Sequence, residues 1–343
     1  MKLYTEAPET GNPYREIFLS QVEHLLDEAY AAAEKRRSAY FQPDTSSVQA
    51  YEASLPVYRE RYRQMLGWPL TLPVPENAPH VSEQVVASDD LGSITRLWIE
   101  TIPGLELYGI LFLPPTRAPV PLVLSQHGGL GTPELCSNFF GSANYNDMTR
   151  RVLRHGVAVF APQLFRWDEK YGRRPDHVQL DQQCKQLGGS LAALEITMLQ
   201  RALDYLTLRD EIIPDRIGML GLSYGGFHTL YTTAAEPRIK VAVSSCFLND
   251  RRRYGRGDWG WFNAANLFFD AEVVGLICPR PLYIEVGLHD ELLDVTSARP
   301  VAKDALVHYQ KLGIPERCVY YEHPGVHELD KGDGGIKFLL NHL

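Results

Sequence analysis

The sequence contains no apolar run that approaches the ~18 residues needed to span a bilayer as a helix. Its first segment, 1–8, lacks the apolar core of a secretory signal peptide. The five cysteines are scattered and odd in number, and they form neither a Cys-x-x-Cys pair nor a metal-ligand spacing. From these absences we expect a protein of the reducing cytoplasm with free, mostly buried thiols, no membrane partner and no metal.

Positive charge is also not in excess. The chain has 34 Lys and Arg against 42 Asp and Glu, which gives a formal net charge of -8. This balance argues against nucleic acid as a partner. The basic cluster Arg251, Arg252, Arg253 and Arg256 is more typical of a solvated loop than of a phosphate site. At 45% hydrophobic and 22% charged, the 343 residues can bury a large core.

The first 80 residues are predicted to form a helical arm (1–80) that packs on the rest of the chain. Apolar residues recur every three or four positions over 15–40, which predicts one helix. A second helix is predicted over 47–66, where Pro56 favours a break or kink. The Pro-rich segment 72–79 then disrupts regular structure.

Residues 81–343 are predicted to form one α/β catalytic domain. Weakly alternating segments at 81–87, 95–100 and 106–113 predict an antiparallel edge. Short apolar runs typical of buried parallel strands follow at 121–124, 157–161, 217–220, 241–244, 282–286 and 319–321. Helical segments lie between them, most clearly at 191–208 and 298–312. This alternation predicts a mostly parallel, doubly wound sheet.

The segment 221–226 reads Gly-Leu-Ser-Tyr-Gly-Gly, between a strand-like run and the helix-compatible run 227–235. A strand, Gly-x-Ser-x-Gly and a helix form the context of a nucleophile elbow, which holds the Ser223 Oγ out at the top of the sheet. The turn is so tight that the residues two before and two after the serine must be small. Gly-x-Ser-x-Gly alone is short enough to occur in an ordinary loop, so the flanking strand and helix favour the catalytic interpretation.

A serine nucleophile needs a base, and the base needs an orienting acid. In nucleophile-elbow enzymes the acid follows the serine and the histidine follows the acid. Asp290, on the loop after an apolar strand, is the expected acid; the alternatives are Glu285, inside that strand, and Asp294, which we expect to cap the next helix. His327 lies beyond a Pro-Gly turn and is the expected base, whereas His323 is restricted by the proline that follows it.

An oxyanion hole requires two N–H groups. One belongs to Tyr224, directly after the serine, and the other should come from the glycine-rich loop 125–131, with Gly129 favoured and Leu130 as the alternative. His127 precedes the serine in the chain, so we expect it to orient this loop rather than act as the base. A phosphate cradle is disfavoured, because neither Gly-x-Gly-x-x-Gly nor a P-loop is present.

Two aromatic-rich segments, 163–168 and 258–262, follow strand ends and are expected to cover the serine. Aromatic faces with charged neighbours suit sugars or an aromatic acyl group, and a lid packed on its own aromatics is the alternative. Arg166 suits a substrate carboxylate, although a salt bridge with Asp168 or Glu169 is more ordinary. The candidate substrate-binding residues are Trp167, Arg166, Trp259 and Trp261.

With these parts in place, the chain over Val81–Leu343 resembles the serine α/β-hydrolases, and within them the dienelactone-hydrolase-like and acetyl-xylan-esterase-like group. The segments that carry the resemblance are 126–129, 154–162, 201–206, 215–226, 245–249 and 324–328. The resemblance implies a triad of Ser223, Asp290 and His327, no cofactor, and hydrolysis of a small-molecule ester such as an acetylated sugar.

Two departures from the family pattern leave the substrate open. Ser223 stands where dienelactone hydrolases carry cysteine, which argues against that activity, and Val326 replaces a usual glycine. One alternative function is a small-peptide peptidase of the prolyl-oligopeptidase-like type, although the arm cannot supply the propeller domain of such enzymes. Another is a non-catalytic binding protein on a hydrolase scaffold, but every catalytic role has a candidate here. The arm packs on its own chain or mediates a homo-oligomer.

Overall fold

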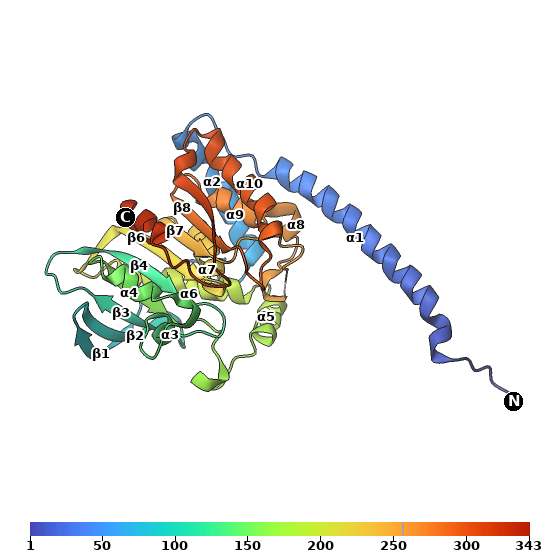
Figure 1. The fold of residues 1–343 in the computed structure, drawn as a ribbon, viewed down its shortest axis with the longest axis horizontal. Coiled ribbons are helices and arrows are strands. Elements are labelled where there is room, and N and C mark those ends of the chain that lie inside the picture. Colours follow the sequence, from blue (N-terminus) through green and yellow to red (C-terminus); the bar gives the residue numbers. More distant parts are fainter. Residues whose placement is uncertain (256) are drawn as a thin grey trace.

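The computed structural model describes residues 1–255 and 257–343. Its centre is one nine-stranded sheet with the strand order β1-β2-β3-β5-β4-β6-β7-β8-β9 (Figure 1). The strands are β1 (Val81–Asp89), β2 (Gly92–Ile102), β3 (Leu105–Leu113), β4 (Val120–Gln126), β5 (Ala158–Pro162), β6 (Ile212–Leu222), β7 (Ile239–Ser245), β8 (Leu282–Gly287) and β9 (Cys318–His323).

The sheet has an antiparallel edge and a parallel body. β1, β2 and β3 pair antiparallel, and β3 also pairs antiparallel with β5. The remaining neighbours, from β5 through β4 to β9, are parallel. Every residue of β5 and β8 is buried, as expected for short apolar runs covered by helices on both faces. The predicted α/β fold with an antiparallel N-terminal edge is therefore confirmed.

Helices cover both faces of this sheet. Helices α2, α6, α7, α9 and α10 contribute to one hydrophobic cluster, and α4 and α11 contribute to another. This is the doubly wound arrangement predicted from the alternating pattern. The helices are α1 (Asn12–Tyr40), α2 (Val48–Leu66), α3 (Pro133–Cys136), α4 (Met148–Leu153), α5 (His177–Gln186), α6 (Leu191–Leu206), α7 (Tyr224–Ala235), α8 (Ala264–Leu267), α9 (Asp270–Ile277), α10 (Val295–Lys311) and α11 (Gly334–Asn341).

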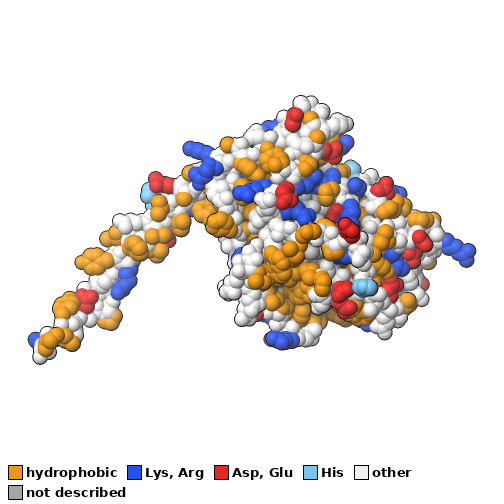
Figure 2. Space-filling model, turned by 180° about the vertical axis from the view of Figure 1, so that it is seen from behind, with side chains coloured by type: hydrophobic (Ala, Val, Ile, Leu, Met, Phe, Trp, Pro, Cys, Tyr) orange, Lys and Arg blue, Asp and Glu red, His pale blue; other side chains and the backbone are white. Residues whose placement is uncertain are grey.

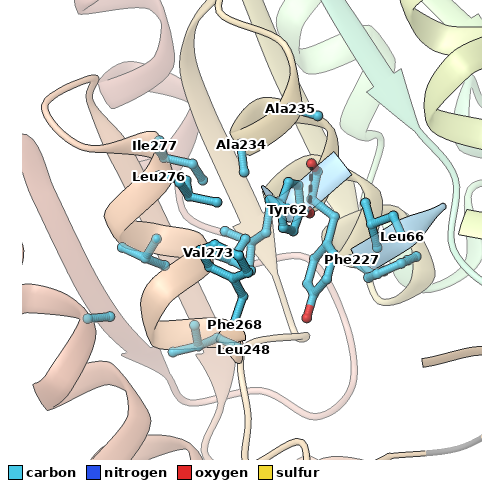
Figure 3. Packing of buried hydrophobic residues seen from close by; sticks show 14 of the residues in the cluster. Tyr62, Leu66, Phe227, Ala234, Ala235, Leu248, Phe268, Val273, Leu276 and Ile277 are labelled. Carbon is cyan, nitrogen blue, oxygen red and sulfur yellow. Dashed lines mark hydrogen bonds between the residues drawn. The ribbon is translucent and has the colours of Figure 1, made fainter. Parts of the chain in front are cut away.

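Helix α2 belongs to the core of the molecule. Figure 3 shows Tyr62 and Leu66 among side chains of α7 and α9, with Phe227 and Phe268 beside them. The Tyr62 hydroxyl donates a hydrogen bond to the Tyr231 carbonyl at 3.1 Å. Because α2 shares this cluster with α6, α7, α9 and α10, the division near residue 80 does not separate two cores.

Pro56 does not interrupt α2, so the predicted break is wrong. Proline removes one helical N–H and would end an exposed helix. Here Tyr51 and Leu55 before it and Tyr62 after it are fully buried, so packing on both sides stabilises the continuous helix.

Helix α1 differs from the others because most of it projects into solvent (Figure 1). Every residue from Asn12 to Ala29 is exposed, and Ala33 is the first buried residue of the helix. Beyond its start, α1 packs mainly on α8. In the described part of the chain, the helices are all too short or too polar to cross a membrane.

Candidate active site

Ser223 occupies the sharp turn between β6 and α7. Its φ of 60° lies in the left-handed region, which a residue with a side chain rarely adopts. Two hydrogen bonds hold the turn: the Ser223 N–H donates to the Ser245 carbonyl, and the Phe227 N–H donates to the Ser223 carbonyl, both at 2.8 Å. Strand, turn and helix therefore occur in the order that the sequence predicted.

The glycines around Ser223 are required by close backbone approaches. A Cβ on Gly221 would overlap the carbonyl of Gly225, and a Cβ on Gly225 would overlap the carbonyl of Gln126. The tight bend thus excludes side chains on both sides of the serine, as expected for an elbow.

His327 and Asp290 come together from two different loops. The His327 Nδ1–H donates to the Asp290 Oδ2 at 2.7 Å. Asn144 anchors the histidine loop, since its side-chain amide donates to the His327 carbonyl at 3.1 Å and its own carbonyl accepts the Leu329 N–H at 3.0 Å. The His327 Nε2 is buried and has no hydrogen-bond partner within the described chain, so it is free to accept a proton.

The surroundings of Asp290 keep its carboxylate ionised. Burial by itself would raise the pKa of Asp290, but the hydrogen bond from His327 and those from the Leu292 and Leu293 N–H groups lower it below its ordinary value. A carboxylate in this state can hold the imidazole in one tautomer and stabilise its protonated form.

The alternative acids and the alternative base have other partners. Asp294 accepts the Thr296 N–H at 2.8 Å and caps α10, as the sequence predicted. Glu285 accepts the Asp330 N–H at 2.8 Å from within β8. His323 is buried and accepts the Gly325 N–H at 3.2 Å.

Both halves of the candidate triad lie next to the end of β7, although no hydrogen bond joins Ser223 to His327 among the described residues. Ser223 is bonded to Ser245, and the next residue, Cys246, has its Sγ within 4.8 Å of ligand atoms of Asp290 and His327. Sequence reasoning treated Cys246 as one of several buried thiols. Nothing in its spacing marked it as a neighbour of the catalytic pair, because strand order brings it there.

This neighbourhood is the one group of His, Cys and Asp side chains among the described residues that could hold a metal ion. However, Asp290 and His327 are already bonded to each other, and burial raises the pKa of the Cys246 thiol. A metal ion would have to break that bond and deprotonate the thiol. The arrangement fits proton transfer better than metal binding.

Two backbone N–H groups are available for an oxyanion. Gly128 lies against the nucleophile, since a Cβ there would be 3.3 Å from the Ser223 Cβ. Its own N–H donates to the Tyr145 hydroxyl, and the Leu130 N–H donates to the Arg166 carbonyl. The Leu130 N–H is therefore already hydrogen-bonded and is not available to an oxyanion. Within the described chain, no such acceptor holds the N–H groups of Gly129 and Tyr224.

His127 orients the oxyanion loop. Its Nε2 accepts the Leu164 N–H at 3.0 Å, so the proton lies on Nδ1 and is donated to the Gly128 carbonyl at 2.8 Å. Burial lowers the pKa of His127 to about 4, which keeps the ring neutral. This geometry agrees with the structural role predicted for His127.

Buried polar groups behind Tyr224 fix its position, and the sequence analysis did not find them. Glu195 accepts the Tyr224 hydroxyl at 2.7 Å, lies 2.8 Å from the His228 Nε2 and accepts the Phe165 N–H at 2.8 Å. All of these polar side chains are fully or almost fully buried. The network fixes the first turn of α7, which carries the Tyr224 N–H.

Arg166 pairs with a residue that the sequence analysis did not consider. Its Nη1 donates to the Asp258 Oδ2 at 2.8 Å, not to Asp168 or Glu169, and its guanidinium lies 4.9 Å from the centre of the Tyr224 ring. Its Nε also lies 3.0 Å from where a Cβ on Gly129 would be. Arg166 thus supports both sides of the candidate oxyanion hole.

The two tryptophans after β7 are packed into the core. Trp259 and Trp261 are each 8% exposed, and both stack at the hydrophobic cluster, Trp259 on Tyr224 and Trp261 on Phe227. Both side chains therefore pack in the hydrophobic core, which is the alternative interpretation that the sequence left open for these residues. Trp167 remains half-buried beside the oxyanion loop, where it bridges to Leu130.

The basic cluster is solvated only in part: Arg252 and Arg253 are exposed on the loop after β7, as the sequence predicted, but Arg251 is not. Arg251 is buried and pairs with Asp270 at 3.1 Å. Arg252 pairs with Asp27 of α1, and Arg253 pairs with Asp294. Arg256, the fourth member, lies outside the described residues.

The sheet order and the sharp strand–turn–helix at Ser223 define an α/β-hydrolase fold. Residues 113–246 match the Dienelactone hydrolase family. The chain is also 26% identical over 260 residues to YtaP of Bacillus subtilis (strain 168), named as a hydrolase; the match covers 71% of this chain and 85% of that protein. These matches agree with the resemblance to the hydrolase superfamily that the sequence predicted.

Solved structures with the same fold are esterases by name. A Bacteroides fragilis NCTC 9343 protein described as an acetyl xylan esterase has a TM-score of 0.67 and 16% identity, covering 88% of this chain and 85% of its own. A glucuronoyl esterase from Solibacter usitatus has a TM-score of 0.63 and 15% identity, covering 87% and 94%. At 15–16% sequence identity, this structural similarity establishes the fold alone.

Proposed function

We propose that this chain is a serine carboxylic-ester hydrolase that uses Ser223, His327 and Asp290 and acts on small acylated carbohydrates. The observation that carries the proposal is the 2.7 Å bond between His327 Nδ1 and Asp290. That bond leaves Nε2 unpartnered, at the edge of the sheet where the elbow holds Ser223.

In the proposed reaction, Ser223 Oγ attacks the acyl carbon while His327 Nε2 takes the hydroxyl proton. His327 then returns that proton to the leaving alcohol, and water hydrolyses the acyl-enzyme by the same route. Asp290 holds the imidazole and stabilises its charged form. The Gly129 and Tyr224 N–H groups bind the oxyanion, a contribution typically worth about 3–4 kcal/mol per donor.

Similarity to esterases that are named for carbohydrate substrates supports an acylated carbohydrate as the substrate. Acetyl xylan and glucuronoyl esterases are named among the structures with this fold. Trp167, half-buried and bridged to Leu130 through its backbone, remains the candidate aromatic residue for a sugar ring. A substrate screen identifies the acyl group and the alcohol of the ester.

The test compares wild type with Ser223→Ala on an aryl acetate and on a panel of acetylated sugars. We expect the variant to lose at least about 10³-fold in kcat, keeping only the contribution of the oxyanion hole and binding. Equal activity would refute the nucleophile. A fluorophosphonate probe should label wild type, and absence of labelling would favour a binding protein on this scaffold. Faster turnover of a chromogenic amide than of the ester would favour a peptidase.

A further inference from the structure

The projecting part of α1 carries a bare apolar stripe. Six large apolar side chains, all exposed, lie on one side of the helix, and a seventh, Ile17, lies outside that side; Figure 2 shows hydrophobic side chains along the whole arm. At 100° per residue the six fall within an arc of about 140°. The stripe consists of Tyr14, Phe18, Leu19, Val22, Leu25 and Leu26.

This stripe continues a face that is already packed. Ala33, seven residues after Leu26, lies on the same side of the helix and is buried. Nearby, the Arg37 side chain donates to the Ala265 carbonyl in α8 at 2.7 Å. The helix thus presents one continuous apolar face. Among the described residues, only its C-terminal part, from about Ala33, packs against the rest of the chain. Helices in proteins are stabilised mainly by packing of such a face rather than by their own propensity.

Outside the stripe, the exposed part of α1 (12–29) carries four acidic residues and no Lys or Arg; its one Arg, Arg15, lies within the arc of the stripe. Glu16, Glu23, Asp27 and Glu28 lie outside the stripe. Helices that lie on membranes carry Lys and Arg on their polar face to meet anionic lipid. The acidic face therefore favours a protein surface over a lipid surface as the partner of the stripe.

Exposed apolar side chains also occur at the carboxyl edge of the sheet, on loops that follow β4, β7, β8 and β9. We call this set the apolar rim; it consists of the exposed residues Leu130, Phe140, Phe262, Leu288, Leu292 and Val326. The arm leaves the body at this same edge, since Asp27 pairs with Arg252 on the loop after β7. Within one copy, however, the arm points away from the body (Figure 1).

We propose that the chain forms a two-fold dimer in which α1 of each copy docks its apolar stripe on the apolar rim of the other. A two-fold arrangement uses each stripe and each rim once. Six large apolar side chains on each surface offer on the order of several hundred Å² per contact, and two such contacts approach the about 1,600 Å² of a standard interface. The dimer would cover the loops of the candidate active site, and it does not depend on the proposed chemistry.

The first test measures mass by light scattering after gel filtration. We expect wild type at twice 38.8 kDa and Phe18→Glu/Leu25→Glu at the monomer mass. The matched control, Ser20→Glu/His24→Glu, adds two charges to the polar side of the same helix and should stay dimeric. All four side chains are exposed within one copy, so the body should stay folded in both variants, whereas Tm should fall only in the stripe variant, which loses the dimer contacts. A monomeric wild type would overturn the proposal.

The second test addresses the rim. Phe140→Glu/Leu292→Glu should also give monomer, whereas Leu72→Glu/Val74→Glu, on exposed apolar residues of the Pro-rich segment, should stay dimeric. If the stripe variant dissociates and the rim variant does not, docking on the rim is wrong. Sedimentation of wild type with phosphatidylserine vesicles, lost in the stripe variant, would identify lipid as the partner and overturn the dimer.

Discussion

The imidazole of His327 and the carboxylate of Asp290 lie 2.7 Å apart although 37 residues separate them in the chain. Asp290 is fully shielded from solvent at its side chain, and His327 is 13% exposed. A shielded carboxylate bonded to Nδ1 favours the tautomer in which Nε2 carries no proton, as the proposed role of His327 requires.

Asp290→Asn should therefore abolish most activity without unfolding the protein. The amide no longer stabilises the imidazolium and can favour the wrong tautomer, so we expect kcat on an aryl acetate to fall about 10³–10⁴-fold. Asp294→Asn is the matched control, because Asp294 caps α10 and pairs with Arg253. That variant should retain kcat within a few-fold. If Asp294→Asn lowered kcat more than Asp290→Asn, Asp294 would be the acid.

The buried carboxyl group of Glu285 should make the free energy of unfolding fall as pH rises. Burial raises the pKa of Glu285 to about 7, from an ordinary value of 4.5. The folded state thus holds a proton that the unfolded state has lost, and stability declines between about pH 5 and 8. We expect a loss on the order of 2–3 kcal/mol in urea unfolding. Glu285→Gln should remove this slope, whereas Glu106→Gln, on an exposed residue, should keep it. An unchanged slope in Glu285→Gln would assign it to another group.

Gly225→Ala should damage the elbow. A Cβ at this position would overlap the Gln126 carbonyl oxygen, and neither backbone segment can move freely. We expect a loss of about 3 kcal/mol or more in the free energy of unfolding, together with loss of activity. At Gly104 no atom lies within 4 Å of an added Cβ and φ is +80°, so Gly104→Ala should cost only about 1 kcal/mol. Equal costs would mean that the elbow is not tight.

Arg166→Met should destabilise the protein because it leaves Asp258, 3% exposed, without its guanidinium partner. Breaking a buried pair in this way typically costs about 3–5 kcal/mol. The double variant Arg166→Met/Asp258→Asn should recover part of that loss, since no charge remains unpaired. If Arg166 instead binds a substrate carboxylate, Arg166→Met will unfold normally and raise KM for acidic esters.

Much of the fold and of the candidate triad could be predicted from sequence. The antiparallel edge, the parallel strands and the turn at Ser223 follow from short-range rules of periodicity and steric exclusion. The pairing of His327 with Asp290 was also predicted, because each residue follows a strand whose carboxyl end reaches the same edge of the sheet.

Other features depended on partners distant in the chain. The partner of Arg166 lies 92 residues away and was not considered. Trp259 and Trp261 follow a strand end like substrate-binding residues, yet α7 packs against them and buries them. Pro56 would break an exposed helix, but core packing on both sides keeps α2 continuous.

The sequence by itself thus predicted the class of fold and the turn at Ser223 from local patterns, and the candidate acid and base from the strands that they follow. Only the tertiary structure decided that Leu130 N–H is occupied, that Cys246 lies beside the catalytic pair and that the stripe on α1 is bare. The physical reason is that burial and hydrogen-bond partners depend on which distant segments pack together, and local pattern does not encode that choice residue by residue.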